Sequence, residues 1–141
     1  MKKIITLLFI ALVSTSITFA QNNSTKKADK LFDRLEYVKA AEEYLKLADK
    51  SPDNYIIERL ADSYYNIFNT REAEKWYSKI IDDEPDAEVI FRYSEMLKAN
   101  GKYKESNVWM SKFSEMNPYD TRAIAFRNAP NYIDQIIKKG K

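Results

Sequence analysis

One stretch decides the fold: it begins at Leu60-Ala61-Asp62-Ser63-Tyr64, continues through Ala73 and Tyr77, and ends at Pro85. Its small, bulky and proline positions recur at one constant interval, once earlier and once later in the chain. The matching sets are Ala28, Ala61 and Ser94; Leu31, Tyr64 and Leu97; Ala40, Ala73 and Ser106; Tyr44, Tyr77 and Met110; and Pro52, Pro85 and Pro118. Three copies in one register predict a structural unit that is built three times.

The spacing within each copy is that of two antiparallel helices in contact. Helices approach closely where a small side chain faces the partner helix, and bulky side chains three or four positions away fill the space beside it. We therefore expect Ala28, Ala40, Ala61 and Ala73 to be buried at helix crossings. Each proline disfavours helix at the residue before it and so separates one pair of helices from the next. The alternative is an irregular helical bundle in which the spacing is accidental.

The periodicity and the turn residues predict helices over 26–35, 37–50, 53–68, 71–83, 86–99, 103–116, 119–127 and 131–139. Asp53 and Asp86 each follow a proline, where an acidic side chain favours a helix start. Thr70 is the expected N-cap of its helix, and Gly101 supplies the left-handed geometry that ends another. The three repeats then cover 26–118. Residues 119–141 form a capping helix and tail, because Arg127 stands where the register predicts a small residue.

Residues 1–20 have the features of a signal peptide. Lys2 and Lys3 form a basic start, an apolar run follows over 4–13, and Thr18-Phe19-Ala20 is a small-x-small cleavage site. The uncharged run is shorter than the ~20 residues that span a membrane, which weighs against the alternative of a retained anchor. We expect export, cleavage after Ala20, and a polar, flexible N-terminus over 21–25. Because the chain has no cysteine, a lipid-modified cysteine, disulfides and thiolate metal sites are excluded.

The composition argues against several classes of function. The full chain has 23 Lys and Arg against 21 Asp and Glu, and removal of Lys2 and Lys3 leaves 21 of each. A neutral chain of this kind is not typical of a nucleic-acid binder. Histidine is absent as well as cysteine, and two glycines cannot build a phosphate-binding loop. We therefore predict no enzyme activity, no cofactor, no metal site and no nucleic-acid partner.

The repeated landmarks resemble the tetratricopeptide repeat, whose signature is Leu-Gly-x-x-Tyr, then Ala-x-x-x-Phe, then Pro. The resemblance implies an all-α fold, an αα-superhelix of three helix pairs plus a C-terminal capping helix. In this family the first helix of each pair lines a concave groove that binds proteins or peptides. Transferred in register, the protein-binding groove positions are Asp29, Phe32, Asp33, Tyr55, Glu58, Asp62, Tyr65, Asn66, Glu88, Phe91, Glu95 and Lys98.

These groove positions hold six carboxylates, four aromatic side chains and a single lysine. Some members of the family clamp the C-terminal carboxylate of a peptide with Lys, Arg and Asn side chains. Here Asp29, Asp62 and Glu95 occupy clamp-type positions and would repel a carboxylate. We expect a partner with basic and apolar residues, and we expect replacement of Asp62 and Glu95 by lysine to weaken binding without unfolding the array. The alternative is that these acids only solvate the open side of the array.

A second resemblance covers nearly the whole chain. The exported N-terminus, the repeats and four segments are similar to the N-terminal repeat region of envelope proteins associated with type IX secretion; the segments are Asn100-Gly101-Lys102-Tyr103, Trp109-Met110, Met116-Asn117-Pro118 and Ala129-Pro130-Asn131-Tyr132. Those proteins continue into a PD40-type β-propeller and an OmpA-like peptidoglycan-binding domain. The resemblance implies an exported interaction scaffold of the bacterial periplasm or outer membrane, within an envelope complex. The alternative is a structural spacer or self-association module, a fragment of a longer peptidoglycan-associated protein whose groove has no ligand.

Overall fold

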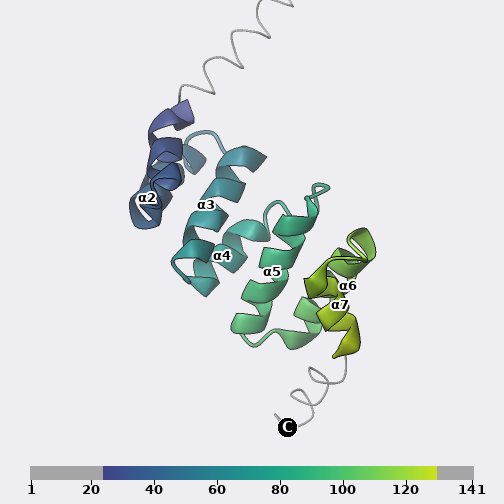
Figure 1. The fold of residues 1–141 in the computed structure, drawn as a ribbon. Helices are drawn as coiled ribbons and strands as arrows, with labels where there is room; N and C mark the ends of the chain where they lie inside the picture. The colour runs from purple at the N-terminus through teal and green to yellow at the C-terminus, as the bar shows by residue number, and fades with distance from the viewer. Residues whose placement is uncertain (1–23, 130–141) are drawn as a thin grey trace, which may run out of the picture.

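The structure, a computed structural model, describes residues 24–129, and all regular secondary structure in this range is helical (Figure 1). The first helix covers 24–33 in its described part. The others are α2 (Tyr37–Ala48), α3 (Asn54–Asn66), α4 (Thr70–Tyr77), α5 (Ala87–Ala99), α6 (Tyr103–Met116) and α7 (Thr121–Asn128). The predicted signal peptide over 1–20, residues 21–23 and the predicted helix over 131–139 lie outside the described residues.

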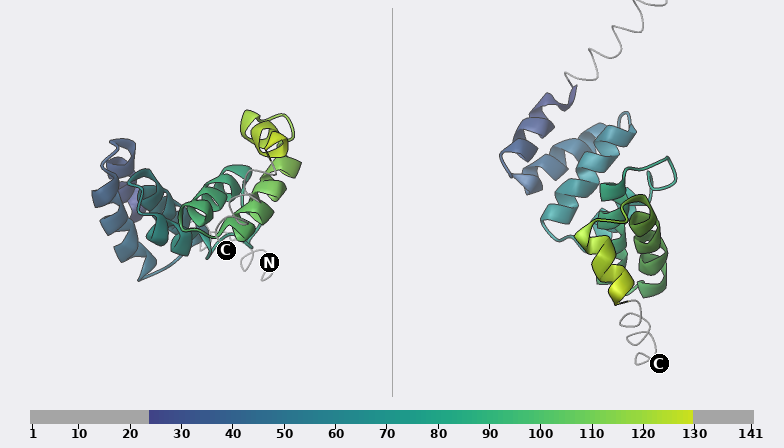
Figure 2. Two further views of the ribbon diagram at one scale, coloured as in Figure 1. Left: turned by 90° about the horizontal axis from the view of Figure 1, so that it is seen from below. Right: turned by 45° about the vertical axis from the view of Figure 1, so that its right-hand side comes forward.

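The helices form three consecutive antiparallel pairs followed by α7. The first helix pairs with α2, α3 pairs with α4, and α5 pairs with α6. Successive pairs stack side by side along an arc, with α2 near one end and α7 at the other (Figure 2). This is the predicted αα-superhelix of three pairs plus a capping helix.

The small residues of the repeat register are buried, as predicted. Ala28 is 1% exposed, and Ala40, Ala61 and Ala73 are fully inaccessible. In the third pair, serines take the place of these alanines, and the Ser106 hydroxyl donates to the Ser94 carbonyl at 2.8 Å. This hydrogen bond satisfies a hydroxyl that would otherwise be costly to bury at the crossing of α5 and α6.

Aspartates that follow the prolines cap the first helix of each later pair. The Asp53 carboxylate accepts from the Ile56 amide at 2.8 Å, and the Asp86 carboxylate accepts from the Val89 amide at 2.9 Å. The predicted helix starts at these two residues are therefore confirmed, with each aspartate as the N-cap. Asp120 is the N-cap of α7, and its carboxylate accepts from the Arg122 amide at 2.7 Å.

The prediction that Thr70 is an N-cap is wrong. Asn69 is the N-cap of α4, and its side chain accepts from the Glu72 amide at 3.4 Å. The Thr70 hydroxyl instead donates to the Asn100 side chain at 2.6 Å. Asn100 in turn donates to Glu74, which also binds Lys102. This chain of polar contacts joins the turn of the second pair to the turn of the third.

The first helix of each pair ends in a residue with left-handed backbone geometry. Gly101 has φ of 80°, as predicted, and Leu35 and Phe68 have φ of 62° and 57°. These three residues stand at equivalent positions of the three repeats. Leu35 and Phe68 are 69% and 72% exposed, so a strained turn presents an apolar side chain to solvent in each of the first two pairs.

Several predicted boundaries differ from the observed ones by one or two residues, and the end of α4 differs by six. The helix predicted over 71–83 ends at Tyr77, because the amides of Lys79 and Ile80 bond to the residues three positions earlier rather than four. The chain then continues as tight turns in which Ile80 is 3% exposed, so it still reaches the core. At the other end, the predicted flexible N-terminus over 21–25 overlaps the first helix, which already includes Ser24 and Thr25. Thr25 is 4% exposed, so the packing against the array starts earlier than its polar character indicated.

The capping helix packs against α6 as the degenerate start of a fourth unit. It begins at Thr121, two residues later than predicted. Arg127, which stands at the small-residue position, points its guanidinium to the Ser114 hydroxyl at 2.7 Å and to the Pro118 carbonyl at 2.5 Å. These bonds tie α7 to the end of α6 and account for an arginine at a position where a further repeat would need a small side chain.

Candidate functional site

The predicted groove positions lie on the first helix, α3 and α5, and we call the surface that they form the groove face. They differ in accessibility. Asp33, Tyr55, Asn66 and Lys98 are exposed, whereas Asp62 is buried at 4% exposure. The rest are half-buried: Asp29, Phe32, Glu58, Tyr65, Glu88, Phe91 and Glu95.

Asp29 is bound by tyrosines of the next two helices. Its carboxylate accepts from the Tyr44 hydroxyl of α2 at 2.5 Å and from the Tyr55 hydroxyl of α3 at 2.8 Å. Burial of Tyr44, together with its hydrogen bond to Asp29, raises the pKa of that tyrosine. Tyr44 therefore stays a neutral donor, and the first clamp-type position is used to join the first pair to the second.

Asp62 makes the equivalent tyrosine contact one repeat later, together with a contact to an arginine. Its carboxylate accepts from the Tyr77 hydroxyl at 2.5 Å and from the Arg92 guanidinium at 2.7 Å. Burial and the charge of Asp62 raise the pKa of Tyr77, so this hydroxyl is also a permanent donor. The expectation that a lysine at position 62 would leave the array folded is not compatible with this geometry, because the lysine would be buried against Arg92.

Glu95, the third clamp-type residue, has a different environment. Met110 stands at the register position of Tyr44 and Tyr77, so no tyrosine of α6 reaches Glu95. Its carboxylate accepts instead from the Tyr65 hydroxyl of α3 at 2.6 Å. Burial and this bond raise the pKa of Tyr65 to about 12.

Three arginines belong to the groove face and were missed by the sequence prediction. Each guanidinium lies over an aromatic ring of the preceding part of the array. Arg59 lies 4.2 Å from the ring centre of Phe32, Arg92 lies 5.5 Å from that of Tyr65, and Arg122 of α7 lies 4.2 Å from that of Phe91. Arg59 and Arg92 stand at equivalent positions of neighbouring repeats, so the repeat register itself contained the signal. The surface around the twelve predicted positions therefore carries three arginines besides Lys98.

Arg122 closes the face at the C-terminal end. Its guanidinium donates to Glu88 of α5 at 2.9 Å and to Asp120 at 3.0 Å. Glu88 also lies 3.4 Å from the Arg92 guanidinium. Two of the six predicted carboxylates, Asp62 and Glu88, are thus paired with arginine, which makes the face less negative than the sequence prediction.

Glu58 is a half-buried carboxylate of this face that keeps its binding capacity. Within residues 24–129 its side chain makes no hydrogen bond or ion pair. Partial burial, followed by the nearby charges of Asp62 and Asp86, raises the pKa of Glu58. A cation placed beside Glu58 would offset both effects.

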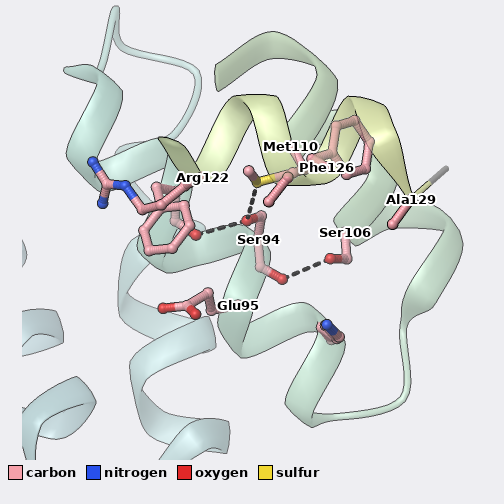
Figure 3. Close-up of a pocket in the computed structure, with 10 residues that line it drawn as sticks. Ser94, Glu95, Ser106, Met110, Arg122, Phe126 and Ala129 are labelled. Carbon is pink, nitrogen blue, oxygen red and sulfur yellow. Dashed lines mark hydrogen bonds between the residues drawn. The ribbon is translucent and has the colours of Figure 1, made fainter. Parts of the chain in front are cut away.

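Two hollows adjoin the groove residues. A pocket of about 340 Å³ lies between α5, α6 and α7 (Figure 3); its lining residues include Phe91, Glu95, Lys98, Met110, Arg122 and Phe126. A wider cleft of about 730 Å³ lies where α3 and α5 end, and Tyr65, Asn66, Phe68 and Lys98 are among its lining residues. Both volumes are in the range of sites that hold a small ligand or several side chains.

Metal-binding clusters and membrane-spanning helices are both absent from the described part of the chain. No group of His, Cys, Asp and Glu between residues 24 and 129 could hold a metal ion. In the same range no helix is long and apolar enough to cross a membrane.

Comparison with known proteins gives structural matches alone. No family model matches the chain, and no curated protein matches it in sequence. The second TPR domain of human RPAP3, in complex with the HSP70 peptide SGPTIEEVD, is similar at a TM-score of 0.64 and 21% identity, covering 76% of this chain and 92% of that one. The first TPR of Spaghetti (RPAP3), bound to the HSP90 peptide SRMEEVD, is similar at a TM-score of 0.65 and 20% identity, covering 82% and 90%.

A third match extends this agreement. The C-terminal TPR-containing domain of an FK506-binding protein from Plasmodium falciparum is similar at a TM-score of 0.61 and 15% identity, covering 84% of this chain and 88% of that one. All three matches are tetratricopeptide-repeat domains, and they agree with the repeat register and the paired helices described above. The chain therefore has the tetratricopeptide-repeat fold.

Proposed function

We propose that this protein is an exported interaction scaffold of the bacterial periplasm or outer-membrane envelope that binds a peptide segment of a partner protein on its groove face. The observation that carries the proposal is Glu58, a half-buried carboxylate with a raised pKa and no partner within residues 24–129. Exposed Tyr55 stands one helical turn before it, and Tyr65 lies two turns after it. Aromatic area beside an unsatisfied charge is typical of a recognition surface.

The partner that suits this face is a segment with Lys or Arg and a few apolar side chains. A basic side chain beside Glu58 would form a charge-assisted hydrogen bond in a partly desolvated place. The peptides in the two RPAP3 structures are acidic, ending in EEVD. Glu58, Asp33 and Glu95 would repel a peptide of that kind, so we propose a ligand of opposite charge for this chain.

The cellular setting is proposed from the sequence. Support for export comes from the signal-peptide features of residues 1–20. Support for an envelope complex associated with type IX secretion comes from the resemblance of Asn100-Gly101-Lys102-Tyr103 and the neighbouring segments. Intact mass of the protein from an exporting host tests the first point, and a mature chain that begins at Gln21 is the expected result.

A second candidate, a structural spacer or self-association module, is favoured by one specific observation. Asp29, Asp62 and Glu95 are all bound within the array itself, and each of them joins one helix pair to another. A groove face whose carboxylates serve to hold the helix pairs together would need no ligand.

Binding by a matched pair of variants separates the two candidates. Glu58→Lys reverses the unsatisfied charge, whereas Glu42→Lys makes the same change at an exposed position of α2. We expect proteins captured from a periplasmic extract by the wild type to be retained by Glu42→Lys and lost with Glu58→Lys, and binding to weaken as salt rises. Equal capture by both variants at low and high salt would remove the groove face from the proposal.

A further inference from the structure

The pocket between α5, α6 and α7 exists because the third repeat lacks a tyrosine. In the first two repeats, Tyr44 and Tyr77 are fully buried and fill the space between one pair and the next. Met110 takes this position in the third repeat, and its sulfur lies 3.6 Å from the Ser94 hydroxyl (Figure 3). The smaller cross-section of the methionine leaves about 340 Å³ between the third pair and α7.

The walls of this pocket are mainly apolar. They are formed by Phe91 of α5, Met110 of α6, and Ala125, Phe126 and Ala129 at the end of α7. The rim carries both signs of charge, from Glu95, Lys98 and Arg122. An apolar hollow of this size gains free energy when apolar side chains fill it.

The chain itself supplies a matching segment at the edge of the pocket. Ala129 is one wall, and the sequence continues from it as Pro130-Asn131-Tyr132-Ile133-Asp134-Gln135-Ile136-Ile137-Lys138-Lys139-Gly140-Lys141. Its apolar residues recur at the spacing of one helical face: Ile133, Ile136 and Ile137, with Tyr132 beside them. Asp134 and Lys138 provide charges of both signs, like the rim.

We propose that residues 130–141 bind in the pocket between α5, α6 and α7 of the same molecule, with isoleucine side chains against Met110 and Phe126. Binding within one molecule is favoured because the segment starts directly after Ala129 in the pocket wall. Its effective concentration at the pocket is therefore high. In this position the segment occupies the C-terminal end of the groove face and competes with any ligand that reaches Glu95 and Lys98. The inference needs no external partner, so its test is independent of the proposed function.

Disulfide trapping tests the proposal directly, because the chain has no native cysteine. The test uses the full chain with two substitutions, Ala125→Cys in the pocket wall and Ile136→Cys in the segment. The matched control pairs Ile136→Cys with Val108→Cys, which is 66% exposed on α6 and does not line the pocket. Both proteins are oxidised by glutathione disulfide, and melting temperatures confirm that each is folded.

We expect the pocket pair to close an intramolecular disulfide about tenfold faster than the control pair. Addition of Ile133→Asp to the pocket pair should slow closure to the control rate, because a carboxylate would enter the apolar pocket. Equal rates for the two pairs would overturn the proposal. Disulfide-linked dimers from the pocket pair would also overturn it, since the segment would then come from a second copy.

Discussion

At the scale of single residues, Asp62 shows how a polar side chain can be part of the core of a repeat array. Its carboxylate is nearly inaccessible, and it receives one hydroxyl from its own pair and one guanidinium from the next. A buried carboxylate is tolerated only when such donors are in place. Asp62 is therefore a structural link, although it is among the groove positions predicted from the sequence.

Replacement of Asp62 by Asn should be strongly destabilising. Arg92 would lose its buried counter-charge, and removal of one member of a buried ion pair costs about 3 kcal/mol. Urea denaturation measures the free energy of unfolding. Asp33→Asn, at an exposed position of the same face, is the control and should change this free energy little. Equal stability of the two variants would contradict the structural role of Asp62.

Glu58 should make the stability of the protein depend on pH in the opposite sense to a salt-bridged carboxylate. Its pKa in the folded state is raised above the ordinary value of 4.5, so the folded state binds this proton more tightly than the unfolded chain does. The resulting stabilisation is present at low pH and is lost as pH rises through the folded-state pKa. Glu58→Gln should therefore gain stability over the wild type between about pH 4 and 7.

Denaturation of both proteins over this pH range gives the difference in free energy of unfolding. Glu42→Gln, an exposed change on α2, should follow the wild type at every pH. A Glu58→Gln difference that stays constant with pH would show that this carboxyl titrates alike in the folded and unfolded states.

At the scale of elements, the turn between the two helices of each pair has the same backbone conformation in all three repeats, although different residues adopt it. Leu35, Phe68 and Gly101 all adopt left-handed geometry, although only glycine does so without strain. The strain at Leu35 and Phe68 is tolerated because the turn closes with backbone hydrogen bonds, such as that from the Asn69 amide to the Tyr64 carbonyl at 2.9 Å.

Gly101→Ala should lower the free energy of unfolding by about 1 kcal/mol, because alanine in left-handed geometry is strained. No atom lies within 4 Å of an added Cβ, so backbone conformation alone causes the loss. Gly101→Asn is the control, and its loss should be smaller because asparagine tolerates this region better. Thermal melts of the two variants give the comparison, and an equal loss in both would point to a cause other than backbone strain.

The helix pairs were predictable because their signal is local and repeated. Ala61 and Ala73 stand at fixed positions of each copy, and a small residue at a crossing needs no knowledge of distant neighbours. The end of α4 at Tyr77 was not predicted, because the residues that follow, Ser78-Lys79-Ile80-Ile81, include no glycine or proline that would end a helix.

The candidate site was predicted less completely, because its chemistry depends on residues far apart in the chain. The burial of Asp62 requires a tyrosine 15 positions later and an arginine 30 positions later. Arg59 and Arg92 are not among the groove positions that the family resemblance transfers to this sequence. Their spacing, equal to that between Ala28 and Ala61, was the available sign that they share one role.

At the scale of the whole molecule, Arg122 stabilises the packing of α7 against the rest of the array. It bonds to Glu88 and Asp120 and lies over the rings of Phe91 and Phe113. Arg122→Ala should lower the free energy of local opening of α7 by about 1–2 kcal/mol. Amide hydrogen exchange should become faster in α7 and stay unchanged in α2 and α3.

The control for this experiment is Arg34→Ala, an exposed change at the end of the first helix. It should leave exchange in α7 at the wild-type rate. Faster exchange throughout the chain in Arg122→Ala would show that α7 opens only together with the rest of the array.

The polar bonds between neighbouring pairs also determine how the protein would respond to mechanical load. In the described part of the chain, the second and third pairs are joined within α3 and α5 by Asp62 and Arg92, and at the turns of the two pairs by Thr70 and Asn100. The first and second pairs share the bond from Tyr55 to Asp29 and the stacking of Arg59 on Phe32. Because the coupling between adjacent repeats sets the cooperativity of a linear array, loss of these bonds should make the helix pairs yield to force one after another rather than together.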